Sequence, residues 1–120
     1  MSKIEKQIEI TKSEFINQYA HAWRIFERLV KEFNSDAWLQ AGRGVITPAR
    51  LSLHILLGTK YYLDDFTPMD YPSGKPFDHE WHKINSTDLP TQNDILTCIP
   101  KVQLKTEEWL TNLDLYAENE

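Results

Sequence analysis

The segment from Thr47 to Asp65 constrains the fold of this chain more than any other part of the sequence. It opens with Thr47-Pro48, a hydroxyl that can cap a helix followed by the residue favoured at the first helical position. Apolar side chains then recur on more than one side of the predicted helix, at Leu51, Leu53, Leu56, Leu57, Tyr61 and Leu63. A helix that is apolar nearly all round is typical of the centre of a protein. We therefore expect a buried, central helix over 48–65, with His54 among its apolar side chains.

Gly58 lies inside this predicted helix. A glycine in a helix interior costs about 1 kcal/mol relative to alanine. The close approach of a neighbouring helix or of a ligand would account for its presence.

A first helix is predicted over 12–34. Thr11 and Glu14 have the spacing of a capping box, which indicates a helix start, so the first ten residues are expected to be loosely attached. Aromatic and aliphatic side chains follow at steps of three and four residues and form one wide apolar stripe: Phe15, Tyr19, Trp23, Phe26, Val30 and Phe33. His21 lies on the polar side and is expected at the surface.

A third helix is predicted over 92–114, after a weaker cap at Thr91 and Asp94. Its apolar positions in register are Ile95, Ile99, Val102, Thr106, Trp109 and Leu113. Pro100 lies within this pattern and should kink the helix, because its ring removes a backbone hydrogen bond.

The connection over 66–91 contains several prolines and is unusually long for a compact domain. It is also unusually aromatic, with Phe66, Tyr71, Phe77 and Trp81. We expect a lid folded over the core rather than a loose tether. A sharp reversal is expected at Gly42 to Gly44, before the second helix.

Length and composition indicate a single domain over 1–120 in an ordinary globular protein, with 41% hydrophobic and 26% charged residues. The net charge of −5 and the scattered basic residues argue against nucleic-acid binding. No segment has the roughly 20 apolar residues of a membrane span, and no signal peptide is recognisable. Cys98 is the single cysteine and is expected to be buried on a helix. A cytoplasmic protein without membrane attachment is therefore expected.

The predicted fold class is all-α, with three long helices forming most of an antiparallel up-and-down bundle. Each predicted apolar stripe is wide, so something else should cover them. A fourth helix or a partner subunit is the physical expectation, which makes a homodimer the predicted assembly.

The order of these elements resembles the DinB-like superfamily of four-helix bundles, which includes the YfiT-type thiol transferases. The resemblance extends from about Lys12 to Leu115 and rests on the aromatic first helix, the Leu-x-His54 pattern ending in Tyr61-Tyr62, and the long loop before the third helix. It implies that His54 is one of three histidines that bind a divalent metal such as zinc or nickel, in a metal-dependent, thiol-linked transferase or hydrolase. In the family the other two histidines stand on a fourth helix, and this chain stops at Glu120 before such a segment. The resemblance therefore implies a site that is incomplete in this chain.

The sequence leaves the roles of the candidate site residues open. His54 is either a hydrogen-bonded core histidine or a metal ligand, and His79 with His82 could supply further imidazoles if that part of the loop formed a helical turn. Asp64 and Asp65 could orient a ligand from the end of the second helix, or could simply be solvated. The alternatives to a metal enzyme are a non-catalytic protein acting through homodimerisation and a small-ligand binder that uses the aromatic lid. No set of nucleophile, base and acid is visible, so the catalytic residues stay unknown.

Overall fold

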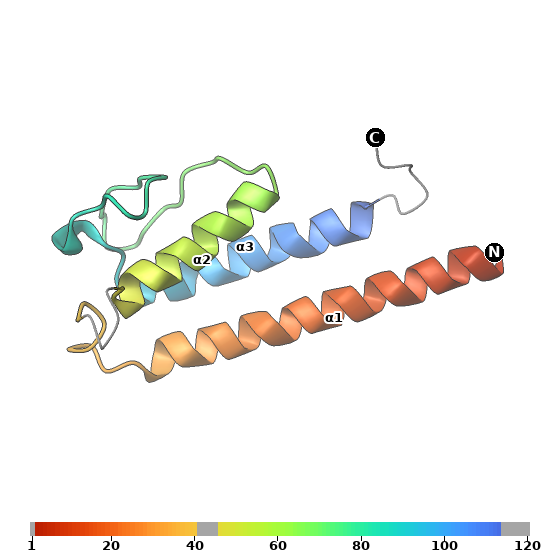
Figure 1. The fold of residues 1–120 in the computed structure, drawn as a ribbon, viewed down its shortest axis with the longest axis horizontal. Helices are drawn as coiled ribbons and strands as arrows, with labels where there is room; N and C mark the ends of the chain where they lie inside the picture. Colours follow the sequence, from red (N-terminus) through yellow and green to blue (C-terminus); the bar gives the residue numbers. More distant parts are fainter. Residues whose placement is uncertain (1, 41–45, 114–120) are drawn as a thin grey trace.

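Residues 2–40 and 46–113 are described by the computed structural model, and they form helices and loops with no strand (Figure 1). Helix α1 spans Lys3–Glu32, α2 spans Pro48–Tyr62 and α3 spans Gln92–Asn112. A short 3-10 helix, η1, spans Ser86–Asp88. The predicted all-α class with three long helices is confirmed. The reversal expected at Gly42 to Gly44 lies outside the described residues.

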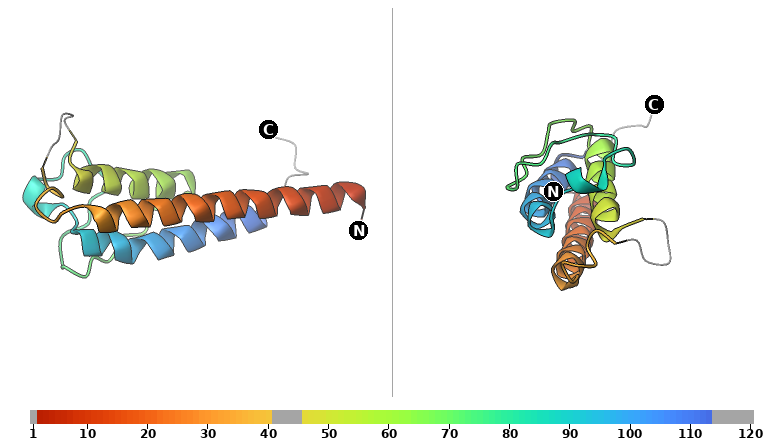
Figure 2. Two further views of the ribbon diagram at one scale, coloured as in Figure 1. Left: turned by 90° about the horizontal axis from the view of Figure 1, so that it is seen from below. Right: turned by 90° about the vertical axis from the view of Figure 1, so that its left-hand side faces the viewer.

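The central helix is α3, which packs against both α1 and α2. The expectation that the helix over 48–65 would be central is therefore wrong. Figures 1 and 2 show that α1 runs opposite to the other two helices, whereas α2 and α3 run in the same direction. The predicted up-and-down alternation therefore fails between α2 and α3. The long connection over 63–91 returns the chain to the end of the molecule where α2 began, so α3 starts beside the start of α2.

Helix α1 begins much earlier than the capping box at Thr11 suggested. Ser2 caps it instead, since its hydroxyl accepts a hydrogen bond from the Glu5 amide at 3.1 Å. Thr11 lies within the helix, and its hydroxyl donates to the Gln7 carbonyl at 2.8 Å. The first ten residues are thus largely helical, because Ser2 supplies a cap of equal chemistry and no helix-breaking residue separates it from Thr11.

The core lies where α3 meets the other two helices and the loop after α2. Its largest contributions from the helices are Trp23 and Val30 of α1, Leu53 and Leu56 of α2, and Ile95, Ile99 and Val102 of α3. The loop adds the buried side chains Met69, Tyr71, Ile84 and Leu89. The loop is therefore folded onto the core, as predicted, and not a tether.

The apolar stripe predicted on the first helix is only partly buried. Trp23 and Val30 are covered, but Phe15, Tyr19 and Phe33 are exposed. Helix α3 covers the side of α1 that carries Trp23 and Val30, whereas the described residues leave much of the adjacent side of α1 exposed. Trp109 of α3 is likewise exposed, although the sequence pattern placed it in register with buried positions.

The ends of the helices are tied together by side chains. Gln92 of α3 donates to the carbonyls of Val30 and Phe33 at 3.0 and 2.6 Å, which satisfies free acceptors at the end of α1. The Trp38 indole donates to the Pro90 carbonyl at 2.9 Å.

The predicted cap at Thr91 and Asp94 is a complete capping box. Helix α3 continues through Pro100, and Cys98 is buried on it as expected. His21 is exposed, which also agrees with the prediction. None of the helices in the described ranges combines the length and the apolar character that crossing a membrane requires.

Candidate functional site

A cleft of about 520 Å³ lies between α2 and the loop that follows it. Its lining is dominated by aromatic and imidazole rings: His54, Tyr61, Tyr62, Phe66, His79 and Trp81, with Leu57, Gly58, Lys60 and Asp65 completing it. This volume lies within the usual range for small-molecule sites. We call this cavity the α2 cleft.

His54 lies on the wall of the α2 cleft and is exposed, so of the two alternatives that the sequence left open, the hydrogen-bonded core histidine is wrong. The buried face of α2 instead carries Leu53, Leu56 and Leu57. His54 stands on another side of the helix, where its ring lies 4.2 Å from the ring of Trp81 at an interplanar angle of 33°. The imidazole therefore packs against the loop rather than against α3.

Arg50 fixes the position of Trp81. Its two terminal nitrogens donate to the backbone carbonyls of Trp81 and Ile84, each at 2.7 Å. Arg50 precedes His54 by about one helical turn, so the two side chains lie on the same side of α2. Arg50 holds the backbone of Trp81 there, and His54 packs against the Trp81 indole. The buried side chain of Ile84 adds an apolar anchor to this part of the loop.

The three histidines predicted as metal ligands do not form one cluster. His79 lines the α2 cleft with His54, and its ring packs on Phe77 at 4.7 Å. His82 is exposed, its ring centroid lies 5.7 Å from that of Trp81, and it does not line the cleft. Within residues 2–40 and 46–113, no three His, Cys, Asp or Glu side chains are placed to hold a metal ion together.

Gly58 forms an open part of the cleft wall. A Cβ atom built on Gly58 would meet nothing within 4 Å, so no neighbouring helix approaches it closely. Of the two explanations offered by the sequence, the close helix is wrong. The other, a ligand, agrees with the position of Gly58 among the residues that line the cleft.

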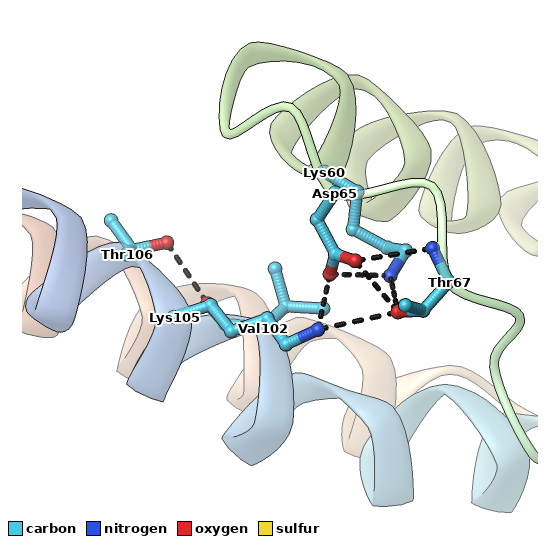
Figure 3. Close-up of polar contacts among 6 residues, drawn as sticks. All are labelled: Lys60, Asp65, Thr67, Val102, Lys105 and Thr106. Atoms are coloured by element: carbon cyan, nitrogen blue, oxygen red, sulfur yellow. Dashed lines mark hydrogen bonds and ion pairs between the residues drawn. The ribbon is translucent and has the colours of Figure 1, made fainter.

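Two residues of the cleft lining, Lys60 and Asp65, belong to an ion-pair cluster (Figure 3). The Asp65 carboxylate accepts from the ammonium groups of Lys60, at 2.7 Å, and Lys105. Thr67 donates to its other oxygen through both hydroxyl and amide, at 2.6 and 3.1 Å. The side chain of Lys60 is only 5% exposed, whereas that of Lys105 is 41% exposed.

The environment of Asp65 sets its charge. Burial alone would raise the pKa of this carboxyl, but hydrogen bonds from Lys105, Lys60 and Thr67 outweigh it and hold the pKa far below its usual range. Asp65 is thus a charged structural residue that joins α2, the loop and α3. This agrees neither with a solvated helix end nor with a carboxylate free to orient a ligand. Asp64, beside it, follows Leu63, the C-cap residue of α2, with a positive φ of 56° and is exposed.

Asp94 ties the loop to the start of α3 in a similar way. Its carboxylate accepts from the Ser73 amide and hydroxyl, at 2.9 and 2.6 Å, and from the Thr91 amide at 2.9 Å. Burial favours the neutral form, but these hydrogen bonds prevail and lower the pKa of Asp94. By contrast, burial raises the pKa of the Cys98 thiol, so this cysteine is not activated as a nucleophile.

Sequence reasoning missed Arg50 and Lys60 as residues that build the cleft. Both had a visible signal, because each is a long cation in an otherwise apolar helix, and Lys60 falls in register with Leu53, Leu56 and Leu57. A lysine on the buried face of a helix requires a partner charge, which here is Asp65.

Comparisons with known proteins give the chain no family. No protein-family model, curated protein or solved structure matches it.

Proposed function

We propose that this protein binds a small, planar aromatic molecule in the α2 cleft. The observation that carries the proposal is the open space at Gly58, in the wall of a cleft lined by rings. A glycine inside a helix destabilises it, and here it also leaves space in the cleft wall unfilled. A ligand that occupies this space would explain why a glycine stands at this position.

The lining indicates the class of ligand. The indole of Trp81 and the imidazole of His54 form one aromatic wall, and Tyr61 and Phe66 pack edge to face at 6.3 Å on the same cleft. Flat rings pack favourably against such walls. The imidazole of His79 supplies a polar group, so a heteroaromatic ring with hydrogen-bonding atoms suits the cleft better than a hydrocarbon.

The substitution Gly58→Leu tests this proposal, because it fills the open space and replaces a helix-breaking residue. We expect it to reduce binding of the fluorescent probe 1-anilinonaphthalene-8-sulfonate at least about tenfold, while the melting temperature stays the same or rises. Thr59→Leu is the matched control, since Thr59 is the next residue of α2 and does not line the cleft. Equal probe binding by the wild type and Gly58→Leu would refute the assignment of the cleft.

A second candidate is the DinB-like reading, a four-helix bundle that binds zinc or nickel for thiol-linked transfer. The observation that favours it is the meeting of two imidazoles, His54 and His79, at one cleft. Two imidazoles do not complete a metal site, so the described residues alone do not fit a bound ion, and further ligands would have to come from another helix. We therefore derive no reaction step through a metal.

Metal binding distinguishes this candidate from the first. If it holds, calorimetric titration with zinc gives a stoichiometric site that is lost in His54→Ala and kept in His82→Ala, because His82 does not line the cleft. Failure of the wild type to bind zinc or nickel would exclude the candidate and leave the aromatic ligand unaffected.

A further inference from the structure

Helix α1 carries an apolar stripe that the rest of the described chain leaves largely uncovered. Its members recur at steps of three and four residues and so share one face of the helix: Ile4, Ile8, Thr11, Phe15, Tyr19, Ala22, Phe26, Leu29 and Phe33. Five of the large side chains among them are between 40% and 66% exposed. We call this face the outer stripe. It lies beside the face of α1 that carries the buried residues Trp23 and Val30.

The first turns of α1 extend beyond the helix that supports it. Lys12 donates to the Thr111 carbonyl at 3.1 Å, which places the end of α3 level with Lys12. The preceding turns of α1 therefore project past α3, as Figure 1 shows. Short helical segments without tertiary contacts are marginally stable in water, so a partner for these turns would stabilise them.

We infer that a second copy of this chain covers the outer stripe, with the two α1 helices packed antiparallel over their whole length. In this register Ile4 lies opposite the partner's Phe33, and Ile8 lies opposite the partner's Leu29. Phe15 lies opposite the partner's Ala22, so that a large side chain meets a small one. The contact is isologous, because each pair occurs twice about a two-fold axis near Gln18.

The charges beside the outer stripe favour this antiparallel register. Lys3 comes near the partner's Glu32 at each end of the pair. A parallel pair would instead place each residue of the outer stripe beside its own copy, so that Phe15 would meet Phe15 and Ala22 would meet Ala22, and large side chains would not be matched by small ones.

The dimensions of α1 are sufficient for a stable contact. A helix of 30 residues is about 45 Å long and about 10–12 Å wide with its side chains. The strip that two such helices share is therefore on the order of 500 Å² on each partner, which reaches the total of about 1,000 Å² expected of a specific interface. The two-fold pair also covers the turns of α1 that project beyond α3.

Sedimentation velocity of the full chain tests this inference, together with the variant Phe15→Glu. We expect a dimer for the wild type and at least a tenfold higher dissociation constant for Phe15→Glu, with unchanged helicity by circular dichroism. Ile10→Glu is the matched control, because Ile10 is 53% exposed on α1, against 51% for Phe15, but lies off the outer stripe. A wild-type monomer at all accessible concentrations, or an equal effect of the two variants, would overturn the inference.

Disulfide formation tests the register independently of Phe15. In a Cys98→Ser background, Gln18→Cys lies beside its own copy at the two-fold axis and should form a disulfide-linked dimer on mild oxidation. Leu29→Cys lies on the outer stripe but far along the helix from its copy, so it should remain monomeric in a denaturing gel. A parallel pair would place Leu29→Cys beside its copy, so preferential crosslinking of this variant would refute the proposed register.

Discussion

Replacing Asp65 by asparagine should destabilise the protein strongly, because it removes the one carboxylate that balances Lys60 in the cluster of Figure 3. The amide is nearly isosteric and can still accept the hydrogen bonds of Thr67. The main change is therefore electrostatic. It leaves a lysine whose side chain is 5% exposed without its counter-charge, at a place where α2, the loop and α3 meet.

The magnitude follows from the unequal burial of the two lysines. Removing one partner of a buried ion pair costs about 3–5 kcal/mol, because the remaining charge is desolvated without compensation. The pair with Lys105 adds less than about 1 kcal/mol, since that side chain is 41% exposed. Allowing for the hydrogen bonds that asparagine retains, we expect Asp65→Asn to lower the free energy of unfolding by about 3 kcal/mol.

Urea unfolding followed by circular dichroism measures this loss. Lys105→Met, as the exposed control, should cost less than about 1 kcal/mol. Adding Lys60→Met to Asp65→Asn should recover part of the loss, because it removes the uncompensated buried charge. A loss below about 0.5 kcal/mol for Asp65→Asn, or no recovery in the double variant, would refute the reasoning.

The pH dependence should follow the same cluster. The folded-state pKa of Asp65 lies below its value of about 3.9 in the unfolded chain, so the unfolded state takes up the proton first as the pH falls. The stabilisation is present above about pH 4 and is lost below it. The stability difference between wild type and Asp65→Asn should therefore narrow as the pH falls from neutral towards 2, and a constant difference would contradict the assignment.

Two further predictions concern the side chains that hold the loop and the linker. Asp94→Ala removes the capping box of α3 and the hydrogen bonds to Ser73, so we expect the free energy of unfolding in urea to fall by about 2 kcal/mol and the loop to be cleaved faster by a protease. Ser73→Ala should cost less, and equal proteolysis of wild type and Asp94→Ala would contradict this role. Trp38→Phe keeps an aromatic ring, although a smaller one, and loses the hydrogen bond to the Pro90 carbonyl, so it should lower stability by at least about 1–2 kcal/mol. Thermal unfolding would detect this loss, and an unchanged melting temperature would show that the bond contributes nothing.

Local sequence signals predicted the elements of this fold well wherever the signal acts within a few residues. The Thr47-Pro48 start of α2 and the Thr91 cap of α3 both appear as expected, because a cap depends on one side chain and the amides beside it. The start of α1 was predicted wrongly because the sequence offers two possible caps. Ser2 and Thr11 carry equivalent hydroxyls, and only the continued helix between them decides which one acts as the cap.

The candidate site was predicted less completely, since its residues come from separate segments. Periodicity placed His54 on an apolar helix, but it did not reveal which side of that helix the loop would cover. The positions of His79 and Trp81 depend on where Arg50 holds the loop. The sequence identified the rings of the α2 cleft individually, and only the path of the loop shows that they share one cavity.

The sequence alone determined that this chain is helical, where its second and third helices begin, and that its long loop folds over the core. These properties follow from short-range hydrogen bonding and from the periodicity of apolar side chains. The tertiary structure decided that α3 rather than α2 is central, that His54 faces the α2 cleft, and that the outer stripe of α1 is left open. Periodicity marks a face as apolar, but which face is buried depends on contacts between residues far apart in the chain.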